Sequence, residues 1–374
     1  MITIIGAGPS GNYLAYLLAK EGKQVEVYEE HDVIGRPIQC TGIVTKAFSD
    51  IIGLDSSFVK NVTNRAEIKS PAGKSFIFQL RDNIVICRHM FDSYLARKAA
   101  KAGAKYFLRS RFLEHREKDG RIELDINVNG EKTTKITDIL VGADGPHSRV
   151  AKSAGLLKGR RYLNALQVKA KYKMDKELFK VQFHRDYFGW VVPEDDEIAR
   201  IGITGFRNPK EHFDKFVKQY IKEKDILEHQ SGLVPVYDPK NRLRKGNVYL
   251  LGDAAALTKA STHGGIIQGL MAAEELKMAI VKGKDYEKLI RKRLGKDLCL
   301  HLFLRETMES FSDEDVEYLV KLTQQDKIKK ILSRFDRDYP TRFLLKIFMI
   351  EPRYFYFIKN ANVKALIAFI RGVL

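Results

Sequence analysis

The chain has 374 residues, of which 44% are hydrophobic, so it can bury a sizeable core and is not a disordered chain. Its length predicts two or three domains. The three cysteines (Cys40, Cys87 and Cys299) are too few and too widely spaced for a zinc motif or a disulfide framework. A small disulfide-rich secreted protein is therefore excluded, a reducing compartment is expected, and no metal site is predicted.

The net charge of +18 at pH 7 favours a polyanionic partner: nucleic acid, an anionic membrane surface or a phosphorylated ligand. Residues 321–374 carry much of the excess, with 12 Lys and Arg against 4 Asp and Glu. No nucleic-acid-binding module is recognisable, so nucleic acid is not expected as a partner. No signal peptide and no apolar run of ~20 residues is visible, which predicts a soluble protein or one on a membrane surface.

The N-terminal residues predict a nucleotide-binding unit. Ile2–Ile5 predicts a strand, and the glycine-rich turn 6–11 and a run with helical spacing follow it. A second strand is expected at Gln24–Tyr28. The alternative is a glycine-rich turn of another α/β protein, but the strand, turn, helix and second strand occur in the order that a dinucleotide site requires.

Each residue type in this unit has a physical role. Gly6 permits the tight turn, Gly8 lets a pyrophosphate approach the backbone, and Gly11 lets helix and strand pack closely. Ser10 belongs to the same motif, where the helix N-terminus offers free N–H groups to phosphate. Glu29, about 20 residues further on, is placed to accept hydrogen bonds from ribose hydroxyls. The motif alone does not separate FAD from NAD.

Two later motifs separate them. Residues 139–149 form an apolar strand that ends in Asp144-Gly145, and residues 247–255 form another that ends in Gly252-Asp253. The second leads to Gly264-Gly265-Ile266 and a predicted helix from 267 to about 280. In this order the motifs resemble the p-hydroxybenzoate hydroxylase-type FAD superfamily. The resemblance implies that Asp144, Asp253, Gly265 and Ile266 bind FAD, with the helix N-terminus aimed at the pyrimidine end of the flavin.

The resemblance extends to two more residues. Arg88 opens a predicted helix, as an arginine that contacts FAD does in the family; otherwise it is an ordinary helix-start arginine on the surface. The strand near Phe112 is expected to flank the adenine, mostly through its backbone.

The branch of the superfamily is indicated by residues 35–43. Pro37-Ile38-Gln39-Cys40 resembles the Pro-x-x-Cys stretch of the geranylgeranyl reductase family, especially its archaeal members. The resemblance implies that Cys40 lies beside the flavin, with Thr41 and Gly42 as further FAD contacts. The alternative for Cys40 is a small buried apolar residue, and Cys87 and Cys299 are expected to be structural.

Residues 188–193 carry the single tryptophan. In the reductase family this aromatic strand lines the substrate cavity, which implies that Phe188 and Trp190 contact substrate. Flavin-dependent halogenases carry a loosely similar stretch, and an aromatic core strand is a third interpretation. The aromatic residues alone do not separate these, whereas the Cys40 stretch favours the reductases.

These motifs predict an α/β protein: a Rossmann-like FAD-binding domain, an inserted antiparallel β-sheet substrate domain and a helical C-terminal region. We expect the FAD-binding domain in residues 1–60, 83–155 and 245–285, the substrate domain in 61–82 and 156–244, and the helices in 286–374. The helical region mixes aromatic and basic residues, which suits an anionic membrane interface or a basic cap packed over the cavity.

The expected activity is FAD-dependent reduction of isoprenoid C=C bonds, on geranylgeranyl chains of archaeal membrane ether lipids or their precursors. Cys40 is the candidate catalytic acid, because a thiol with a reference pKa of ~8.5 is protonated at neutral pH. The alternatives are a monooxygenase or halogenase, a reductase of another polyprenyl compound such as a quinone, and a non-catalytic prenyl-binding scaffold. The electron donor is left open among NAD(P)H, ferredoxin, another donor protein and a deazaflavin, and the expected location is cytoplasmic, peripheral on the inner face of the membrane.

Overall fold

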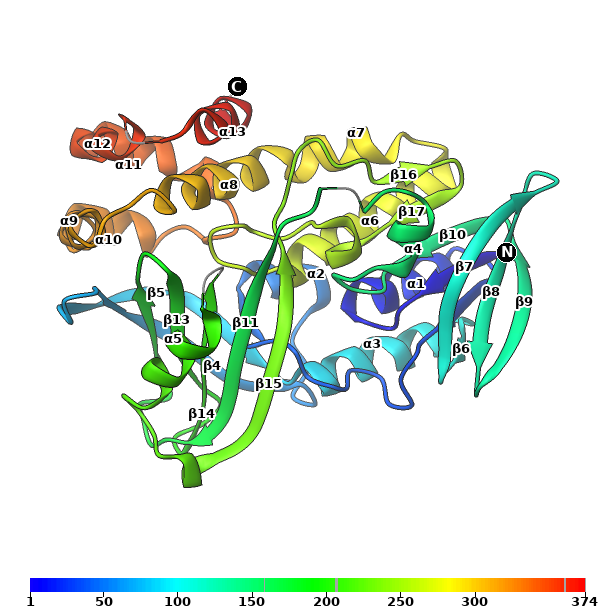
Figure 1. Cartoon of the computed structure of the whole chain (residues 1–374), viewed down its shortest axis with the longest axis horizontal. Helices are drawn as coiled ribbons and strands as arrows, with labels where there is room; N and C mark the ends of the chain where they lie inside the picture. Colours follow the sequence, from blue (N-terminus) through cyan, green and yellow to red (C-terminus); the bar gives the residue numbers. More distant parts are fainter. Residues whose placement is uncertain (158, 206–207, 360, 374) are drawn as a thin grey trace.

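The computed structural model describes residues 1–157, 159–205, 208–359 and 361–373. Figure 1 shows a parallel sheet with its helices, a large curved sheet beside it, and C-terminal helices that lie along the top of both. The nucleotide-binding signature and the aromatic strand therefore belong to neighbouring layers.

The first sheet is built on the N-terminal strand. All four residues of β1 are buried, as expected for a strand in the middle of a sheet, and the strand order is β16-β17-β10-β1-β2-β6. All its pairs are parallel except β16 with β17. The strands are β1 (Ile2–Ile5), β2 (Val25–Tyr28), β6 (Lys105–Phe107), β10 (Ile139–Gly142), β16 (Arg244–Lys245) and β17 (Val248–Leu250).

Helices and a small sheet cover this parallel sheet. α1 packs on both α3 and α6, and the three-stranded sheet β7-β8-β9 contacts β10 and α4. The elements are α1 (Pro9–Lys20), α2 (Ala47–Ile52), α3 (Arg88–Lys101), α4 (Arg149–Ser153), α6 (Ile266–Lys282), the 3-10 turn η2 (Gly252–Ala255), β7 (Ser110–Lys118), β8 (Arg121–Val128) and β9 (Glu131–Thr137).

The second sheet has eight strands in the order β15-β11-β14-β13-β12-β4-β5-β3. Its inner residues on β14 are buried almost throughout, because α5 covers one face. The elements are β3 (Ile43–Thr45), β4 (Val59–Lys69), β5 (Ser75–Ile86), β11 (Tyr162–Lys171), β12 (Leu178–Phe183), β13 (Tyr187–Pro193), β14 (Ile198–Gly205), β15 (Ile226–Pro235), α5 (Pro209–Val217) and the 3-10 turn η1 (Glu223–Asp225).

Two features of this sheet differ from the sequence-based expectation. Its neighbouring strands are antiparallel except β12 and β4, which are parallel because two distant chain segments meet there and no hairpin joins them. The sheet also takes in β3 and the end of β5, which the sequence analysis placed in the FAD-binding domain. The residue boundaries proposed for the domains stay a prediction.

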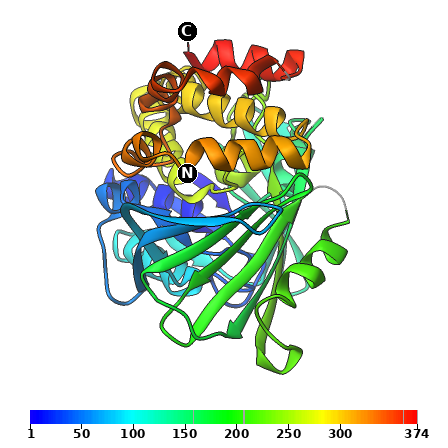
Figure 2. The same cartoon turned by 90° about the vertical axis from the view of Figure 1, so that its left-hand side faces the viewer.

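The C-terminal helices lie over the eight-stranded sheet (Figure 2). Val320 of α9 and Leu332 of α10 share an apolar cluster with residues of β4, β5 and β12. The elements are α7 (Tyr286–Ile290), a π-helical turn η3 (Arg291–Gly295), α8 (Lys296–Met308), α9 (Asp313–Thr323), α10 (Asp326–Leu332), η4 (Pro340–Arg342), α11 (Leu344–Ile350), η5 (Pro352–Tyr354), α12 (Phe355–Lys359) and α13 (Val363–Val373).

The predicted fold class is confirmed: a Rossmann-like sheet, an added and mainly antiparallel sheet, and a helical C-terminal region. One hydrophobic core joins the parallel sheet to α6, α8 and α13, so the C-terminal helices are part of the folded body. Within the described ranges, none of the helices has both the length and the apolar character needed to span a bilayer.

Candidate functional site

A cavity of about 1270 Å³ lies where the two sheets and the C-terminal helices meet. All the predicted site residues line it except Gly11: Gly6, Gly8, Ser10, Glu29, Cys40, Thr41, Gly42, Arg88, Phe112, Asp144, Phe188, Trp190, Asp253, Gly265 and Ile266. The structure therefore brings the predicted FAD residues and the predicted substrate residues into one continuous space.

The glycine-rich turn has the geometry that its sequence indicates. Gly6 has φ +102°, and a Cβ there would lie 2.4 Å from the carbonyl oxygen of Ala143. At Gly11 a Cβ would lie 2.2 Å from the carbonyl oxygen of Gly6, so α1 and β1 approach as closely as glycine allows. Gly8, which precedes α1, faces open space and leaves the first N–H groups of the helix without a side-chain cap. This geometry forms a cradle that fits a phosphate group.

Ser10 and Glu29 border the same cradle. A Cβ on Gly252 would lie 2.7 Å from the Ser10 hydroxyl oxygen, and a Cβ on Gly269 would lie 2.1 Å from it. Ser10 of α1 therefore packs directly on the glycines of η2 and α6. The Glu29 carboxylate accepts from the backbone N–H of Ala7 at 2.8 Å and from that of His31 at 3.0 Å. It is thereby held at the end of β2, where the ribose of a dinucleotide binds.

The Gly-Asp turn and α6 meet on the other side of the cavity. A Cβ on Gly265 would lie 2.8 Å from Oδ1 of Asp253, so only glycine lets the helix begin so close to this carboxylate. Burial raises the pKa of Asp253, although the charge of Arg88 acts in the opposite direction. α6 has no side-chain cap at Gly265, and its N-terminal N–H groups are open to an acceptor in the cavity.

Asp144 has a local structural role as well. Its carboxylate accepts from the Ser148 hydroxyl at 2.6 Å and from the Val150 N–H at 3.1 Å, which shapes the turn before α4. Burial raises the pKa of Asp144, while these hydrogen bonds lower it. Phe112 of β7 is buried and borders the cavity, and β7 packs on α4, the helix that follows this turn.

Arg88 is held rigidly beside Cys40. The guanidinium donates from Nε to Oδ1 of Asp92 at 3.1 Å and from the NH2 group to Oδ2 at 2.9 Å. Asp92 is buried, and its backbone carbonyl accepts from Asn12. Burial lowers the pKa of Arg88, but Asp92 and Cys40 raise it overall. A fixed positive charge therefore lies next to the Cys40 thiol.

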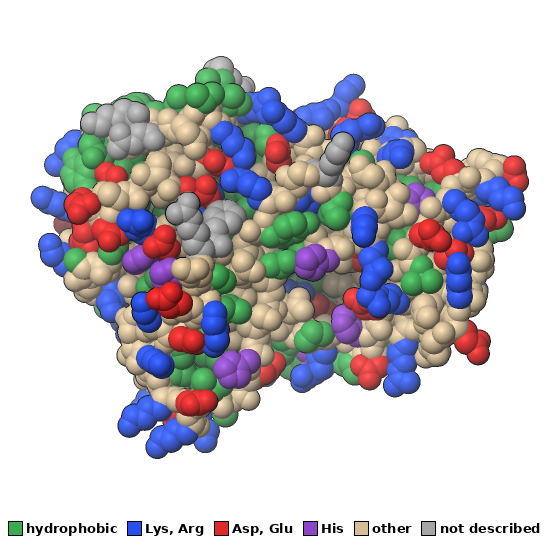
Figure 3. Space-filling model, viewed as in Figure 1, with side chains coloured by type: hydrophobic (Ala, Val, Ile, Leu, Met, Phe, Trp, Pro, Cys, Tyr) green, Lys and Arg blue, Asp and Glu red, His purple; other side chains and the backbone are tan. Residues whose placement is uncertain are grey.

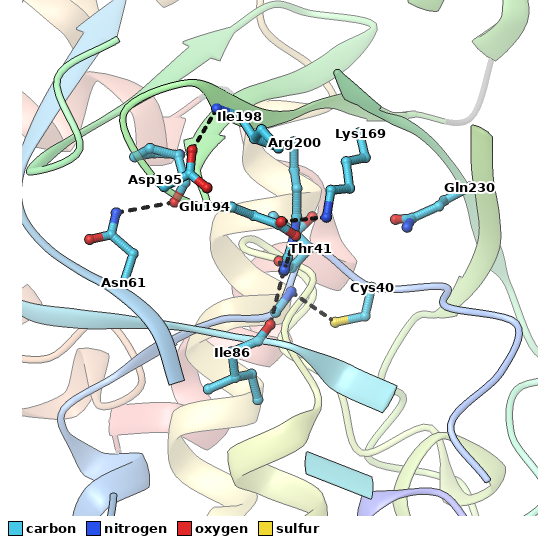
Figure 4. Close-up of polar contacts among 12 residues, drawn as sticks. Cys40, Thr41, Asn61, Ile86, Lys169, Glu194, Asp195, Ile198, Arg200 and Gln230 are labelled. Carbon is cyan, nitrogen blue, oxygen red and sulfur yellow. Dashed lines mark hydrogen bonds and ion pairs between the residues drawn. The ribbon is translucent and has the colours of Figure 1, made fainter. Parts of the chain in front are cut away.

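The loop that carries Cys40 is fastened to the eight-stranded sheet by Arg200 of β14 (Figure 4). The guanidinium donates to the backbone carbonyl of Thr41 and, at 3.0 Å, to that of Ile86. A Cβ on Gly42 would lie 2.7 Å from the same guanidinium, and its φ is +71°, so this position requires glycine. The Glu194 carboxylate forms an ion pair with the Arg200 guanidinium at 2.5 Å and a second ion pair with the Lys169 ammonium at 2.6 Å.

Gln167 of β11 joins the same loop to the aromatic strand. Its side-chain oxygen accepts from the Thr41 hydroxyl at 2.7 Å and from the indole N–H of Trp190 at 2.8 Å. Its amide N–H donates to Gln230 of β15 at 2.5 Å. Gly202 makes room for the indole, because a Cβ there would lie 2.6 Å from the ring. Buried polar groups that satisfy one another fix a single arrangement of loop and strand.

Phe188 and His263 close the space next to the start of α6. Their ring centres are 5.7 Å apart in an edge-to-face arrangement, and both side chains line the cavity. His263 has φ +61°, and its ring nitrogens are buried where the ring packs against Phe188. Burial, with a contribution from the charge of Arg305, holds the pKa of His263 well below its usual value. The ring is therefore a neutral polar group beside the aromatic ring of Phe188.

A buried ion pair ties the start of α6 to the C-terminal region. Lys259 donates to Asp338, which also accepts from Thr45 at 2.7 Å and from Gln268 at 3.1 Å. Burial raises the pKa of Asp338, but Lys259 and Arg337 lower it further, so the carboxylate is ionised. This contact fixes the C-terminal helices over the cavity.

The cavity continues away from the glycine-rich turn into an apolar chamber. Its walls come from the eight-stranded sheet and from α8–α12 and include Phe78, Phe179, Leu319, Leu332, Phe303, Ile347 and Phe357. These side chains offer few hydrogen-bonding groups, so the chamber suits a long hydrocarbon chain.

Sequence reasoning missed several residues of this site. Gln167, Gln230, Arg200, Lys259 and Asp338 are buried polar residues that strand or loop patterns do not distinguish from surface positions. His263 lies beside the glycine pair Gly264-Gly265, but only its positive φ and the packing of its ring against Phe188 single it out.

The site is that of an FAD-binding flavoprotein: residues 1–280 match the family model described as an FAD binding domain, and the chain belongs to this family. The cradle at Gly8, the open N-termini of α1 and α6 and the buried Asp253 fit this cofactor.

Within that class the chain is similar to digeranylgeranylglycerophospholipid reductase of Methanothrix thermoacetophila, with 28% identity over 363 residues, 88% of this chain and 93% of that protein. Its fold is similar to a geranylgeranyl bacteriochlorophyll reductase-like protein of Thermoplasma acidophilum, with TM-score 0.83, 26% identity and coverage of 96% of this chain and 97% of that one. The resemblance drawn from the sequence motifs is confirmed.

The fold is also shared with the flavin-dependent halogenase CmlS, with TM-score 0.67 and 16% identity, over 95% of this chain and 77% of that one. At this identity the likeness concerns the fold alone. The choice between reduction and halogenation therefore depends on the site.

Proposed function

We propose that this protein is an FAD-dependent reductase that hydrogenates C=C bonds in the geranylgeranyl chains of membrane glycerophospholipids. The observation that carries the proposal is the single cavity that runs from the nucleotide-binding turn at Gly8 into the apolar chamber under the C-terminal helices. Relatives named for this reaction along nearly their whole length support the same substrate class.

The reaction breaks one π bond and forms two C–H bonds, one by addition of a hydride and one by addition of a proton. FAD, when bound and reduced, supplies the hydride. The chain must supply the proton and exclude water, because an isolated alkene is weakly polarised and water would compete for reactive groups. The aromatic and aliphatic walls of the chamber perform the exclusion.

Cys40 is the proposed proton donor. Its thiol lies in the cavity, accepts a hydrogen bond from the Gly42 N–H at 3.3 Å and neighbours the charge of Arg88. After the proton leaves, Arg88 stabilises the thiolate, which recovers a proton from solvent before the next turnover. Arg88 cannot rotate away because both of its hydrogen bonds to Asp92 hold it in place.

Phe188 and Trp190 are proposed to position the chain. They stand on one face of β13 and border the cavity, and Trp190 is locked by Gln167 while Phe188 rests on His263 and Phe183. Rigid aromatic walls hold a flexible isoprenoid with one double bond facing the flavin region, which reduces the entropic cost of a productive alignment.

The proposed location is the cytoplasmic face of the membrane, with the protein bound peripherally. The support is the substrate, which is a membrane lipid, together with the basic C-terminal segment, in which 12 Lys and Arg face 4 Asp and Glu over residues 321–374. Anionic lipid headgroups attract such a segment.

The test is anaerobic reduction of the purified holoprotein with dithionite, followed by addition of a geranylgeranylated phosphoglycerolipid. We expect the oxidised flavin absorbance to return while the lipid gains two hydrogens per double bond by mass spectrometry. A flavin that stays reduced until air enters points instead to an oxygenase, a halogenase or another isoprenoid substrate such as a quinone. A purified protein that takes up no FAD would overturn the proposal and leave a prenyl-binding scaffold.

A further inference from the structure

α13 has an apolar surface on two opposite sides. Its buried side consists of Ala365, Ala368 and Gly372, which recur at helical spacing. Its exposed side consists of Val363, Leu366, Ile367 and Ile370, which recur at the same spacing and are 73, 37, 45 and 52% exposed. A helix on the surface of a soluble protein normally turns its bulky apolar side inward, whereas α13 turns mainly small residues and Phe369 inward and four bulky apolar residues outward.

The inward side is fixed by close packing. A Cβ on Gly372 would lie 2.5 Å from the side chain of Leu300, so α13 approaches α8 as closely as glycine permits. Phe369 packs on Phe303 with ring centres 4.9 Å apart, and Lys364 pairs with the buried Glu306 at 3.1 Å. These contacts determine the orientation of α13, and the exposed side is their consequence.

Neighbouring helices extend the exposed apolar side. On α11, Leu345, Met349 and Ile350 are 44, 73 and 46% exposed, and Phe355 at the start of α12 is 54% exposed. Nine of the 18 exposed large hydrophobic residues within the described ranges lie between positions 345 and 370. Figure 3 shows this concentration at the upper left, with Lys and Arg side chains around it. We call the exposed apolar residues of α11–α13 the apolar platform.

Charge selects the partner. Lys346 belongs to α11 and Arg371 to α13, and residues 321–374 carry a strong positive excess even though Arg353 pairs with Glu351 and Lys364 with Glu306. A second copy of this chain would present an equally basic platform and would be repelled. An anionic bilayer offers both an apolar interior for the bulky side chains and a negative surface for the basic ones.

The platform is also the outer side of the catalytic chamber. Ile347 and Phe348 of α11 and Phe357 of α12 are buried and line the cavity, whereas their neighbours Met349, Ile350 and Phe355 face outward. One helical layer thus separates the exposed platform from the space proposed to hold the lipid chain.

We propose that the apolar platform inserts into the interface of an anionic lipid bilayer and seats the chamber directly on the membrane from which it takes its substrate. The inference rests on the proposed function only for the identity of the lipid that enters. The insertion itself follows from the arrangement of α11–α13.

The experiment is flotation of the holoprotein with vesicles of phosphatidylglycerol or of neutral phosphatidylcholine. The wild type is expected to float with the anionic vesicles and to bind the neutral ones at least 10-fold more weakly. Ile367→Glu with Ile370→Glu should reduce binding to anionic vesicles at least 10-fold. Leu227→Glu with Ile136→Glu, at positions that are each 48% exposed outside the platform, is the matched control and should float like the wild type.

A second variant, Met349→Glu, guards against misfolding of α13, because this side chain is 73% exposed and its replacement leaves the core intact. Both platform variants should reduce detergent-dispersed lipid at the wild-type rate and lose activity on lipid held in vesicles. A wild type that does not reduce detergent-dispersed lipid would contradict the proposed function, but it would not affect the conclusion on vesicle binding. The proposal is overturned if the variants float as well as the wild type. It is also overturned if the wild type does not bind vesicles and instead forms a dimer that these substitutions dissociate.

Discussion

The indole N–H of Trp190 donates to the side-chain oxygen of Gln167 at 2.8 Å, and this hydrogen bond couples the aromatic wall of the cavity to the Cys40 loop. The coupling arises because the same oxygen accepts from Thr41, the residue after Cys40. A substrate that displaces Trp190 would therefore also disturb the proposed proton donor. The aromatic wall and the Cys40 loop are therefore held as one unit.

Gln167→Leu should weaken this unit. The substitution leaves the indole N–H and the Thr41 hydroxyl without their acceptor, which costs about 1–3 kcal/mol in the free energy of unfolding. We expect a higher KM for the lipid and a lower kcat, while FAD content stays at the wild-type level. Steady-state kinetics with detergent-dispersed lipid and urea denaturation measure both effects. Gln182→Leu is the control, because Gln182 is equally buried on the same sheet but does not line the cavity.

Cys40→Ala should lower turnover by about 100-fold or more, as expected for the loss of a positioned general acid. Binding of FAD should be little changed, because the Gly8 cradle and Asp253 are untouched. Cys87→Ala serves as the control for loss of a thiol elsewhere. Normal turnover by Cys40→Ala, measured as mass gain of the lipid, would remove the thiol from the mechanism.

Gly8→Ala and Gly11→Ala should separate cofactor binding from folding. At Gly8 a Cβ meets open space, so the apoprotein should unfold at the wild-type temperature while FAD affinity falls by about 10-fold or more. At Gly11 a Cβ would lie 2.2 Å from the carbonyl oxygen of Gly6, so the apoprotein itself should be destabilised by about 1–3 kcal/mol. Flavin fluorescence titration and thermal unfolding of the apoproteins are the two measurements. Equal stability losses in both variants would contradict this assignment.

Glu194 should make stability depend on pH. Burial raises its pKa, but Arg200 and Lys169 lower it further, so the pKa in the folded protein lies below the usual value of 4.5. A lowered folded-state pKa means that the ionised carboxylate stabilises the fold fully above pH 4.5, and that this stabilisation is lost as the pH falls through the folded-state pKa. Urea denaturation from neutral pH down to acid should show this loss.

Glu194→Gln tests the origin of that loss. It leaves the buried charge of Arg200 without its partner and should cost about 3 kcal/mol at neutral pH, and the difference from wild type should shrink in acid. Asp214→Asn, which breaks the exposed pair of Lys210 and Asp214, should change stability little at either pH. A difference between Glu194→Gln and wild type that stays constant with pH would argue against the carboxylate as its source.

The FAD-binding half could be predicted from sequence because its signals are local. Gly6 and Gly11 are required by contacts within one strand–turn–helix unit, and Glu29 follows at the end of the next strand, so the chain order already contains the geometry. The family resemblance also predicts a helix that begins at Arg88 and a β-strand around Phe188 and Trp190, and the structure has both.

Only the tertiary structure decided which distant residues meet. Thr41, Gln167 and Trp190 come from three segments, and their hydrogen bonds exist only once β11 and β13 lie in one sheet beside the Cys40 loop. The parallel pairing of β4 with β12 has no local signal either.

The outward side of α13 shows the same division. The sequence alone determines an apolar helix with one small and one bulky side, because residues three or four positions apart lie on the same side of a helix. Which side faces the core was decided by α8, since only the small side, with Gly372 against Leu300, fits the close approach of the two helices. Packing against a distant segment therefore turns the bulky residues of the apolar platform outward, where we propose that they insert into the membrane.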